Sequence, residues 1–197
     1  YLRDDKEEKL TSAEWNNISL QICLGVRKIH NLILRTPTGK MEKFFHGNLK
    51  PSNILLFRKS KRLVARISDL GLLVEKTDSP YQAPELNSNY FDYRSDLFSL
   101  GKILEQIQGK TSGVYVEYKE VRNVRALIAS MQNEKSEDRE ESVGKLIKQF
   151  WEIRRKMEKQ RLAYSFLQLG ANLYNMEVYE KCLPDFEKAI ELMPELY

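Results

Sequence analysis

Residues 46–56 decide how the rest of this sequence is interpreted, and they read His46-Gly47-Asn48-Leu49-Lys50-Pro51-Ser52-Asn53-Ile54-Leu55-Leu56. The polar first part, which contains a glycine and a proline, predicts a compact, irregular loop. The apolar residues that follow it, 54–57, and a second apolar run at residues 63–67 predict two strands. Basic residues 58–62 separate these strands, so the sequence predicts a β-hairpin directly after the loop.

Apolar residues recur at helical spacing on both sides of this hairpin. Before it, residues 12–32 predict a helix that Ser12 can cap. After it, residues 68–89 predict a loop that contains Pro80 and Pro84. The remaining helices are predicted from apolar faces within residues 97–107, 121–131 and 143–153, and from a helical pair at 163–194. The predicted fold class is therefore mainly α with one small β-hairpin.

The composition is that of an ordinary globular protein. The chain has 197 residues, of which 42% are hydrophobic and 30% charged, and this excludes disorder, collagen and low-complexity fibre. No apolar run approaches the roughly 20 residues of a membrane helix, and residues 1–6 lack the apolar core of a signal peptide. Cys23 and Cys182 are too few and too far apart for a zinc site or a disulfide framework. We therefore expect reduced core cysteines in an intracellular, cytoplasmic protein that does not enter membranes.

The net charge of +4 is spread unevenly along the chain. Residues 163–197 carry two lysines and six acids, so the first 162 residues carry +8. Residues 152–162 alone hold five basic residues and two acids. Such a stripe could bind nucleic acid or an acidic partner, but few aromatic residues interleave with the charges, which favours a solvated helix face.

The loop at residues 46–53 resembles the catalytic loop of eukaryotic protein kinases, whose pattern is H-R-D-L-x-x-x-N. Further motifs follow in the family's order. Asp69-Leu70-Gly71 resembles D-F-G, residues 83–85 match A-P-E, and residues 95–101 resemble the start of the family's central helix. The resemblance covers residues 12 to 155, which correspond to the C-terminal lobe of a kinase. It implies a kinase-like C-lobe at residues 1–157.

Several of these residues have structural roles in the family. The resemblance implies that Asp96 accepts hydrogen bonds from the backbone of the loop. It also implies that Glu85 pairs with Arg139 and that His46 bonds backbone carbonyls nearby. Breaking one side of such a buried ion pair costs about 3–5 kcal/mol. We therefore expect these residues to hold the fold rather than to perform chemistry.

The chemistry of the family requires a carboxylate that orients the attacking hydroxyl, and that position holds Asn48 here. An amide cannot take a proton at neutral pH. Gly47 replaces the arginine that receives a phosphorylated activation segment. Lys50, Asn53 and Asp69 are retained, and they are the candidate contacts for ATP and Mg²⁺. The alternative for Asn53 is a structural role in which its side chain bridges the loop backbone.

The sequence contains no glycine-rich loop, no V-A-I-K strand and no partner helix with its glutamate, the parts that form the N-lobe in the family. The chain does not begin with Met, and it is expected to be either a fragment or a lone C-lobe. We expect no cofactor for this chain alone. ATP and Mg²⁺ become candidate ligands once an N-lobe completes the cleft.

The last 40 residues, 158–197, resemble one tetratricopeptide repeat, a helical hairpin with a period of about 34 residues. Phenylalanine replaces the family's tryptophan, and Cys182 replaces an alanine. Gly170 and Cys182 would be the small residues where the two helices cross, and Pro184 lies inside the second helix. The residues that match the pattern are Phe166, Leu169, Gly170, Leu173, Tyr179, Cys182, Phe186, Ala189 and Pro194.

Two functions from different classes remain open at this point. The first is a pseudokinase module that acts as a protein-interaction scaffold or regulator, with protein partners bound through the hairpin and the C-lobe surface. The second is a divergent Ser/Thr-type kinase that transfers phosphate once an N-lobe is supplied. Binding of nucleic acid through the basic stripe is the weaker third alternative.

Overall fold

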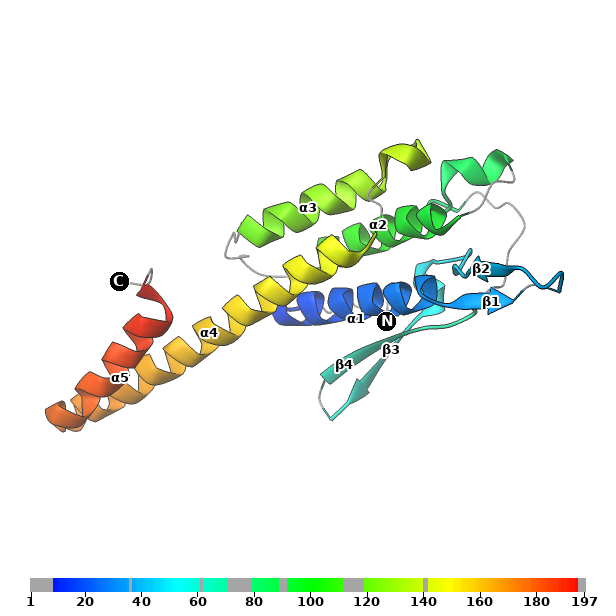
Figure 1. Ribbon diagram of the computed structural model, residues 1–197. Helices are drawn as coiled ribbons and strands as arrows, with labels where there is room; N and C mark the ends of the chain where they lie inside the picture. The colour runs from blue at the N-terminus through cyan, green and yellow to red at the C-terminus, as the bar shows by residue number, and fades with distance from the viewer. Residues whose placement is uncertain are drawn as a thin grey trace. The chain divides into compact units, whose positions relative to one another are not determined.

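The computed structural model describes residues 9–35, 37–60, 62–70, 79–88, 92–111, 119–139 and 142–194. These residues form five α-helices and two two-stranded antiparallel sheets, so the predicted mainly helical fold class is confirmed. Gly71 of the Asp69-Leu70-Gly71 motif lies outside the described residues. The elements in Figure 1 are α1 (Ser12–His30), β1 (Ile33–Arg35), β2 (Met41–Lys43), β3 (Ile54–Lys59), β4 (Arg62–Ile67), α2 (Tyr93–Gly109), α3 (Lys119–Met131), α4 (Gly144–Asn175) and α5 (Tyr179–Leu192).

The N-cap of helix α1 is Thr11, and the predicted cap, Ser12, is the first residue of the helix. The Glu14 backbone N–H donates to Thr11 Oγ1 at 3.2 Å, and the Thr11 N–H donates to Glu14 Oε2 at 3.1 Å. This reciprocal capping box satisfies two backbone donors at the start of the helix. The Ser12 prediction was wrong because the glutamate three residues after Thr11 completes the box.

A hairpin that the sequence did not predict follows α1. Strand β1 pairs with β2 in antiparallel register, with Leu34 opposite Glu42. The predicted helix to residue 32 therefore ends earlier, and Pro37 and Gly39 lie between the two strands of this hairpin. Both strands are exposed along their whole length, so no alternation of buried and exposed residues marks them in the sequence.

The predicted second hairpin is present and packs on α1 through β4. Helix α1 supplies side-chain amides to the backbone of β4. Gln21 Nε2 donates to the Leu63 carbonyl at 3.2 Å, and the Ala65 N–H donates to Gln21 Oε1 at 3.0 Å. These bonds pair a strand edge that would otherwise be open, which fixes β3–β4 and the loop before it against the helix.

The core lies where α1, α2, α3 and the first turns of α4 meet. Trp15 of α1 packs edge-on against Phe150 of α4, with ring centroids 5.4 Å apart. Helix α2 is buried on almost every side, and it packs against α1 and α3. The largest fully buried side chains are Trp15, Phe150, Ile18, Leu20, Ile22, Leu97, Leu100, Ile103, Leu104, Ile107, Met131 and Leu146.

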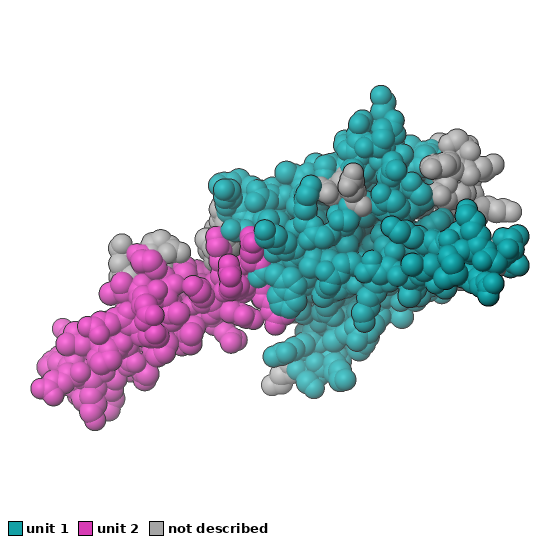
Figure 2. Space-filling view, in the orientation of Figure 1, with its two compact units in different colours: residues 1–151 teal, residues 152–197 magenta. Residues whose placement is uncertain are grey.

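The chain divides into two compact units, residues 1–151 and residues 152–197, shown in different colours in Figure 2. The division falls within α4, whereas the sequence placed the domain boundary between residues 157 and 158. The domain assignment therefore stays a prediction. In the second unit, the C-terminal half of α4 and helix α5 form a hairpin whose turn contains Glu177 at a φ of 61°. Among the described residues, no helix is both long enough and apolar enough to cross a lipid bilayer.

Candidate functional site

Asp96, in the first turn of α2, is the centre of the hydrogen-bond network that holds residues 46–48. Its side chain is 2% exposed. The His46 N–H donates to Asp96 Oδ2 at 2.7 Å, and the Gly47 N–H donates to Oδ1 at 2.9 Å. Gly47 has a φ of 76°, a conformation that glycine adopts without steric cost. One buried carboxylate therefore shapes the turn that presents Asn48.

Both ring nitrogens of His46 form hydrogen bonds. The Asn48 backbone N–H donates to His46 Nδ1 at 3.3 Å, so Nδ1 is the unprotonated nitrogen. Nε2 therefore carries the hydrogen and donates to the Ser68 carbonyl at 2.9 Å. The ring is 1% exposed, and both of its nitrogens bond backbone groups. This geometry joins the loop to the end of β4 and leaves the ring no position for proton transfer.

Asn53 crosses the loop and bonds its backbone. Its Nδ2 donates to the Asn48 carbonyl at 2.9 Å, the bridging arrangement considered from the sequence. The Asn53 amide oxygen receives no hydrogen bond from the residues that the structure describes. This oxygen and the Asp69 carboxylate are hard oxygen donors of the kind Mg²⁺ prefers. Ser68 Oγ bonds the backbone carbonyl of Asn53 and the side chain of Asp69, and lies 3.3 Å from both the Asn53 backbone oxygen and Asp69 Oδ2.

Asp69 and Lys50 differ in their surroundings. Asp69 is exposed and has a left-handed backbone conformation, with a φ of 58°. Lys50 is half-buried and precedes the short 3₁₀ segment Pro51–Asn53. Within the described part of the chain, no hydrogen bond or ion pair joins the Lys50 side chain to Asp69 or Asn53. The Lys50 backbone carbonyl does accept a hydrogen bond from the Asn53 backbone N–H at 3.0 Å. The structure thus brings Asn48 and Asn53 together and leaves Lys50 and Asp69 without a direct link to each other.

Glu85 and Arg139 form a bidentate ion pair that lies apart from the loop. Arg139 Nη1 donates to Glu85 Oε1 at 2.6 Å, and Nη2 donates to Oε2 at 2.7 Å. The remaining donors of the guanidinium bond the carbonyls of Asn133, Glu134 and Arg94. The Arg139 side chain is 0% exposed, so its charge depends entirely on these partners.

The pKa of Glu85 lies below its usual value. Burial by itself raises this pKa, because it disfavours the charged carboxylate. Hydrogen bonds from Arg139, from a backbone N–H and from Ser95 Oγ at 2.8 Å, together with the charge of Arg139, outweigh that effect. Glu85 is therefore a paired anion in the folded protein across the physiological pH range.

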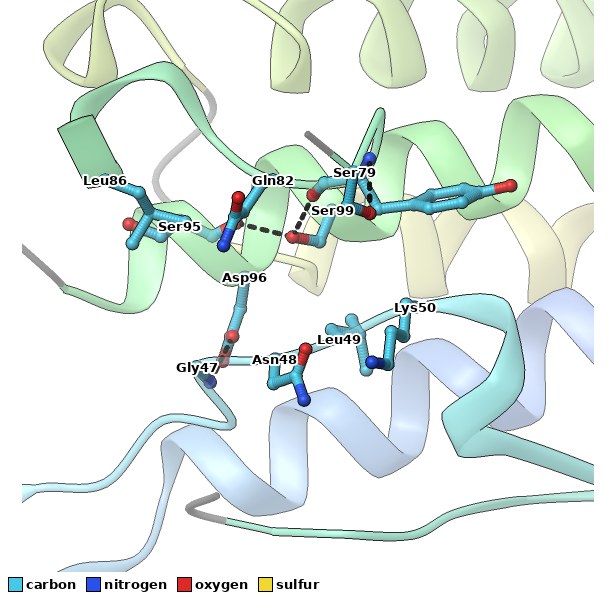
Figure 3. A pocket seen from close by; sticks show the side chains of 11 residues that line it. Gly47, Asn48, Leu49, Lys50, Ser79, Gln82, Leu86, Ser95, Asp96 and Ser99 are labelled. Carbon is cyan, nitrogen blue, oxygen red and sulfur yellow. Dashed lines mark hydrogen bonds between the residues drawn. The ribbon is translucent and has the colours of Figure 1, made fainter. Parts of the chain in front are cut away.

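A narrow pocket lies between the loop and α2 (Figure 3). Its volume is about 20 Å³, which holds one water molecule rather than a nucleotide. Asn48 and Lys50 line it from the loop, and Ser99 lines it from α2, where its Oγ donates to the Tyr81 carbonyl at 2.6 Å. Among the described residues, this space next to Asn48 offers no room for an adenine ring or a triphosphate.

The second unit places its small residues between its two helices. An added Cβ at Gly170 would lie 2.8 Å from Phe186 Cε1, so α4 and α5 approach closely there. Cys182 and Ala189 are buried, and Cys182 Sγ lies 3.0 Å from the Tyr179 carbonyl. Phe166 and Leu173 are half-buried. Leu169, Tyr179 and Pro194 are exposed. Tyr179 of α5 nevertheless packs edge-on against Tyr174 of α4, with ring centroids 5.3 Å apart.

Two residues of the network were missed as partners from the sequence. His30 Nε2, at the end of α1, donates to Asp96 Oδ2 at 2.9 Å, and Ser95 donates to Glu85. Ser95 immediately precedes Asp96, and this position beside a motif residue is the sequence feature that could have indicated its hydrogen-bonding role. Nothing in the local sequence around His30 indicates a partner 66 residues away.

A helical lobe with a His-x-Asn-x-Lys-x-x-Asn loop fixed by a buried aspartate, and with a separate Glu–Arg pair, is the arrangement of a protein-kinase lobe. The comparison with known families agrees. The family described as "Protein kinase domain" matches residues 1–169. The chain therefore belongs to the protein kinase domain family.

Curated relatives are kinases that share limited identity with this chain. A eukaryotic translation initiation factor 2-alpha kinase 1 of Plasmodium falciparum is 33% identical over 108 residues, which cover 50% of this chain and 6% of that protein. A probable serine/threonine-protein kinase of Dictyostelium discoideum is 27% identical over 120 residues, 52% of this chain and 17% of that protein. The chain thus spans only a small part of the length of these relatives.

Solved structures agree on the fold. The kinase domain of PknI from Mycobacterium tuberculosis superposes with a TM-score of 0.53 at 17% identity, and a double mutant of it gives 0.54 at 16%. The match covers 77% of this chain and 58–59% of the PknI chains. At this level of identity the likeness concerns the fold alone.

Proposed function

We propose that this chain is a catalytically impaired, pseudokinase-like module that acts as a protein-interaction scaffold or regulator. The observation that carries the proposal is Asn48 at the position of the family's catalytic carboxylate. A carboxamide can hydrogen-bond a hydroxyl group, but it cannot accept its proton at neutral pH. Without that group, the loop retains its shape and loses its base.

The geometry of the loop supports this proposal. The polar atoms of Asp96, Glu85 and Arg139 form hydrogen bonds within the lobe, with backbone groups, with each other in the Glu85–Arg139 pair, and with the His30 and Ser95 side chains. His46 does the same with both ring nitrogens. These contacts stabilise the lobe whether or not phosphate is transferred. A lobe that keeps its structural pairs and lacks its base suits a role in binding rather than in turnover.

We further propose that this chain supplies only the C-terminal lobe of a kinase domain. None of its nine glycines falls in a G-x-G-x-x-G pattern. The part of the PknI kinase domain that the chain covers, 58–59%, is compatible with one lobe. Such a lobe would bind ATP poorly, because half of the adenine pocket would come from elsewhere.

We also propose that the hairpin of α4 and α5 is a tetratricopeptide-type unit that binds a protein. The close approach at Gly170 and the burial of Cys182 and Ala189 support this assignment. A single hairpin of this kind cannot bury both of its faces. Its exposed apolar side chains include Leu169, Leu183 and Ile190, and they fit a role in contacting a partner.

A divergent Ser/Thr-type kinase is the second candidate function. Lys50, Asn53 and Asp69 are retained at the positions that hold phosphates and Mg²⁺ in the family. The amide oxygen of Asn53 receives no hydrogen bond from a described residue, which leaves it available to a cation. The curated relatives are named as kinases. In this reading, an N-lobe completes the cleft and restores ATP-dependent phosphotransfer.

The change Asn48→Asp distinguishes the two functions when the chain is joined to an N-lobe. We expect no phosphate transfer from the unmodified protein and measurable transfer from the variant, because the variant regains the carboxylate that orients the hydroxyl. The measurement is incorporation of labelled phosphate into a generic protein substrate with Mg²⁺. Asn48→Asp combined with Asp69→Ala is the control and should be inactive. Mg²⁺-dependent transfer by the unmodified protein would refute the scaffold proposal.

A thermal-shift titration with ATP tests nucleotide binding by the chain itself. A ligand that binds the folded state stabilises it by about 2.7 kcal/mol at a hundredfold excess over Kd. We expect no shift in melting temperature at millimolar ATP, with or without Mg²⁺. A shift that requires Mg²⁺ and disappears in Asp69→Ala would favour the kinase reading, because Asp69 is a candidate Mg²⁺ ligand.

A further inference from the structure

A second hollow lies on the C-lobe surface between α3 and the first turns of α4, on a part of the chain that no kinase motif uses. It is a groove of about 370 Å³, much larger than the pocket beside Asn48. Ala126 and Leu127 provide its apolar surface. Asn123 Nδ2 donates to Gln149 Oε1 at 3.1 Å and ties the two helices together. The groove is lined by Asn123, Ala126, Leu127, Lys145, Lys148 and Gln149.

The two helices that form this groove are strongly basic. Helix α3 and residues 144–151 carry five basic residues and one acid, which gives a net charge of +4. Lys145 and Lys148 line the groove and are exposed. They are three residues apart on one helix, so their like charges repel each other. Lys148 forms no ion pair with any residue that the structure describes.

The lining combines apolar and cationic surface in one place. The methylene stems of Lys145 and Lys148 extend the apolar surface of Leu127 and Ala126, and both lysines bring positive charge to this surface. An occupant that places an apolar side chain on Leu127 can therefore bring acidic groups to both lysines. Pairing these lysines with carboxylates also relieves their mutual repulsion.

We propose that this groove binds an acidic segment of a partner protein, with one apolar side chain on Leu127 flanked by carboxylates that pair with Lys145 and Lys148. The inference rests on the proposed scaffold function and names the surface that would carry it. A nucleic acid fits the groove less well. Phosphates would pair with the lysines, but none of the six lining residues is aromatic, so bases would find no stacking surface.

Selection from a random twelve-residue peptide display library on the immobilised chain tests the proposal. We expect the enriched peptides to share an apolar residue flanked by Asp or Glu. Their affinity, measured by fluorescence anisotropy, should fall about tenfold or more in Lys145→Glu/Lys148→Glu, because attraction becomes repulsion. The matched control Lys43→Glu/Lys59→Glu changes the net charge equally at exposed positions outside the groove. It should keep the affinity within about twofold.

Several results would overturn the proposal. One is a selection that enriches no acidic peptides, and another is equal binding of the selected peptides to the groove variant and the control. Preferential binding of a polyuridine RNA that the groove variant abolishes would assign the site to nucleic acid instead. A melting curve establishes that the variant is folded, and Lys145→Ala/Lys148→Ala replaces it if charge reversal lowers the melting temperature. Phosphotransfer by the unmodified protein would refute the scaffold function without affecting the peptide measurement, so the two failures can be told apart.

Discussion

At the scale of single residues, the sequence motifs indicated three polar side chains that hold the lobe together, but not all of their partners. Asp96, Glu85 and Arg139 could be selected because each belongs to a motif at a fixed place in the order. His30 and Ser68, which bond Asp96 and His46, belong to no motif and meet them only after folding. The sequence left two roles open for Asn53, a bond to the loop backbone and a bond to a cation. The two roles do not exclude each other, because one amide can bond the backbone through its nitrogen and a cation through its oxygen.

The change Glu85→Gln should destabilise the protein by about 3–5 kcal/mol at pH 7, because it leaves the fully buried Arg139 without its anionic partner. A clear drop in melting temperature is the expected result. Glu158→Gln is the matched control. It removes the exposed partner of Arg154, 3.0 Å away, and should change stability by less than about 1 kcal/mol. An equal drop in both variants would mean that the buried pair has no special role.

The same carboxylate predicts the response to acid. The pKa of Glu85 is lowered in the folded protein, so its contribution to stability is complete above its ordinary pKa of 4.5 and is lost as the pH falls below that value. Melting temperatures measured between pH 6 and pH 3 should therefore fall less steeply in Glu85→Gln than in the unmodified protein. Parallel slopes would contradict the assignment of this carboxylate.

At the scale of elements, helices were predicted well and strands only in part. Helices α2 and α3 can be predicted from apolar residues at helical spacing, and strands β3 and β4 from two apolar runs. Hairpin β1–β2 has no such pattern, since every residue of both strands is exposed. The use of Gln21 to pair the edge of β4 also could not be foreseen. It depends on the distance between two elements that lie more than 40 residues apart in the chain.

The contact between α4 and α5 leaves no room for a side chain at Gly170. Alanine favours a helix interior over glycine by about 1 kcal/mol, but here its Cβ would meet three atoms of the Phe186 ring at 2.8–3.1 Å. We therefore expect Gly170→Ala to lower the midpoint of thermal unfolding of the hairpin, and Gly170→Trp to abolish the contact. Far-UV circular dichroism measures both changes.

Gly109, at the end of α2, provides the control for this prediction. An added Cβ there meets no atom within 4 Å, so Gly109→Ala should be neutral or mildly stabilising. Phe186→Leu should partly rescue Gly170→Ala, because the smaller side chain relieves the overlap. If Gly170→Ala were as stable as Gly109→Ala, the close approach of the two helices would be refuted.

At the scale of the whole molecule, the chain consists of two compact units, of which residues 1–151 carry a net charge of +5 and residues 152–197 a net charge of −1. The sequence predicted a C-terminal helical hairpin and a change in charge after residue 162. It could not fix the division between Trp151 and Glu152, because α4 is a single helix of 32 residues without an internal break in its sequence pattern there. The spacing of apolar residues predicts where a helix lies in the sequence. It does not predict which turns of that helix pack into which core.

The two tryptophans give a probe for one unit. Trp15 and Trp151 both lie in residues 1–151, and the second unit contains none. We expect urea unfolding followed by tryptophan fluorescence to occur at a higher midpoint than unfolding followed by circular dichroism at 222 nm. A small unit with exposed leucines buries little apolar surface and should unfold first. Coincident curves would show that the chain unfolds as one cooperative unit.

The hydrogen bonds of Asn48 have a consequence for how easily this protein could change. Among the described residues, they all run through its backbone N–H and carbonyl, and none uses the carboxamide. Codons for asparagine and aspartate differ by a single base. Because the fold does not depend on the Asn48 side chain, that one-base change would place a carboxylate in an already formed loop. In mutational terms, the proposed pseudokinase lobe lies one nucleotide away from a carboxylate at this position.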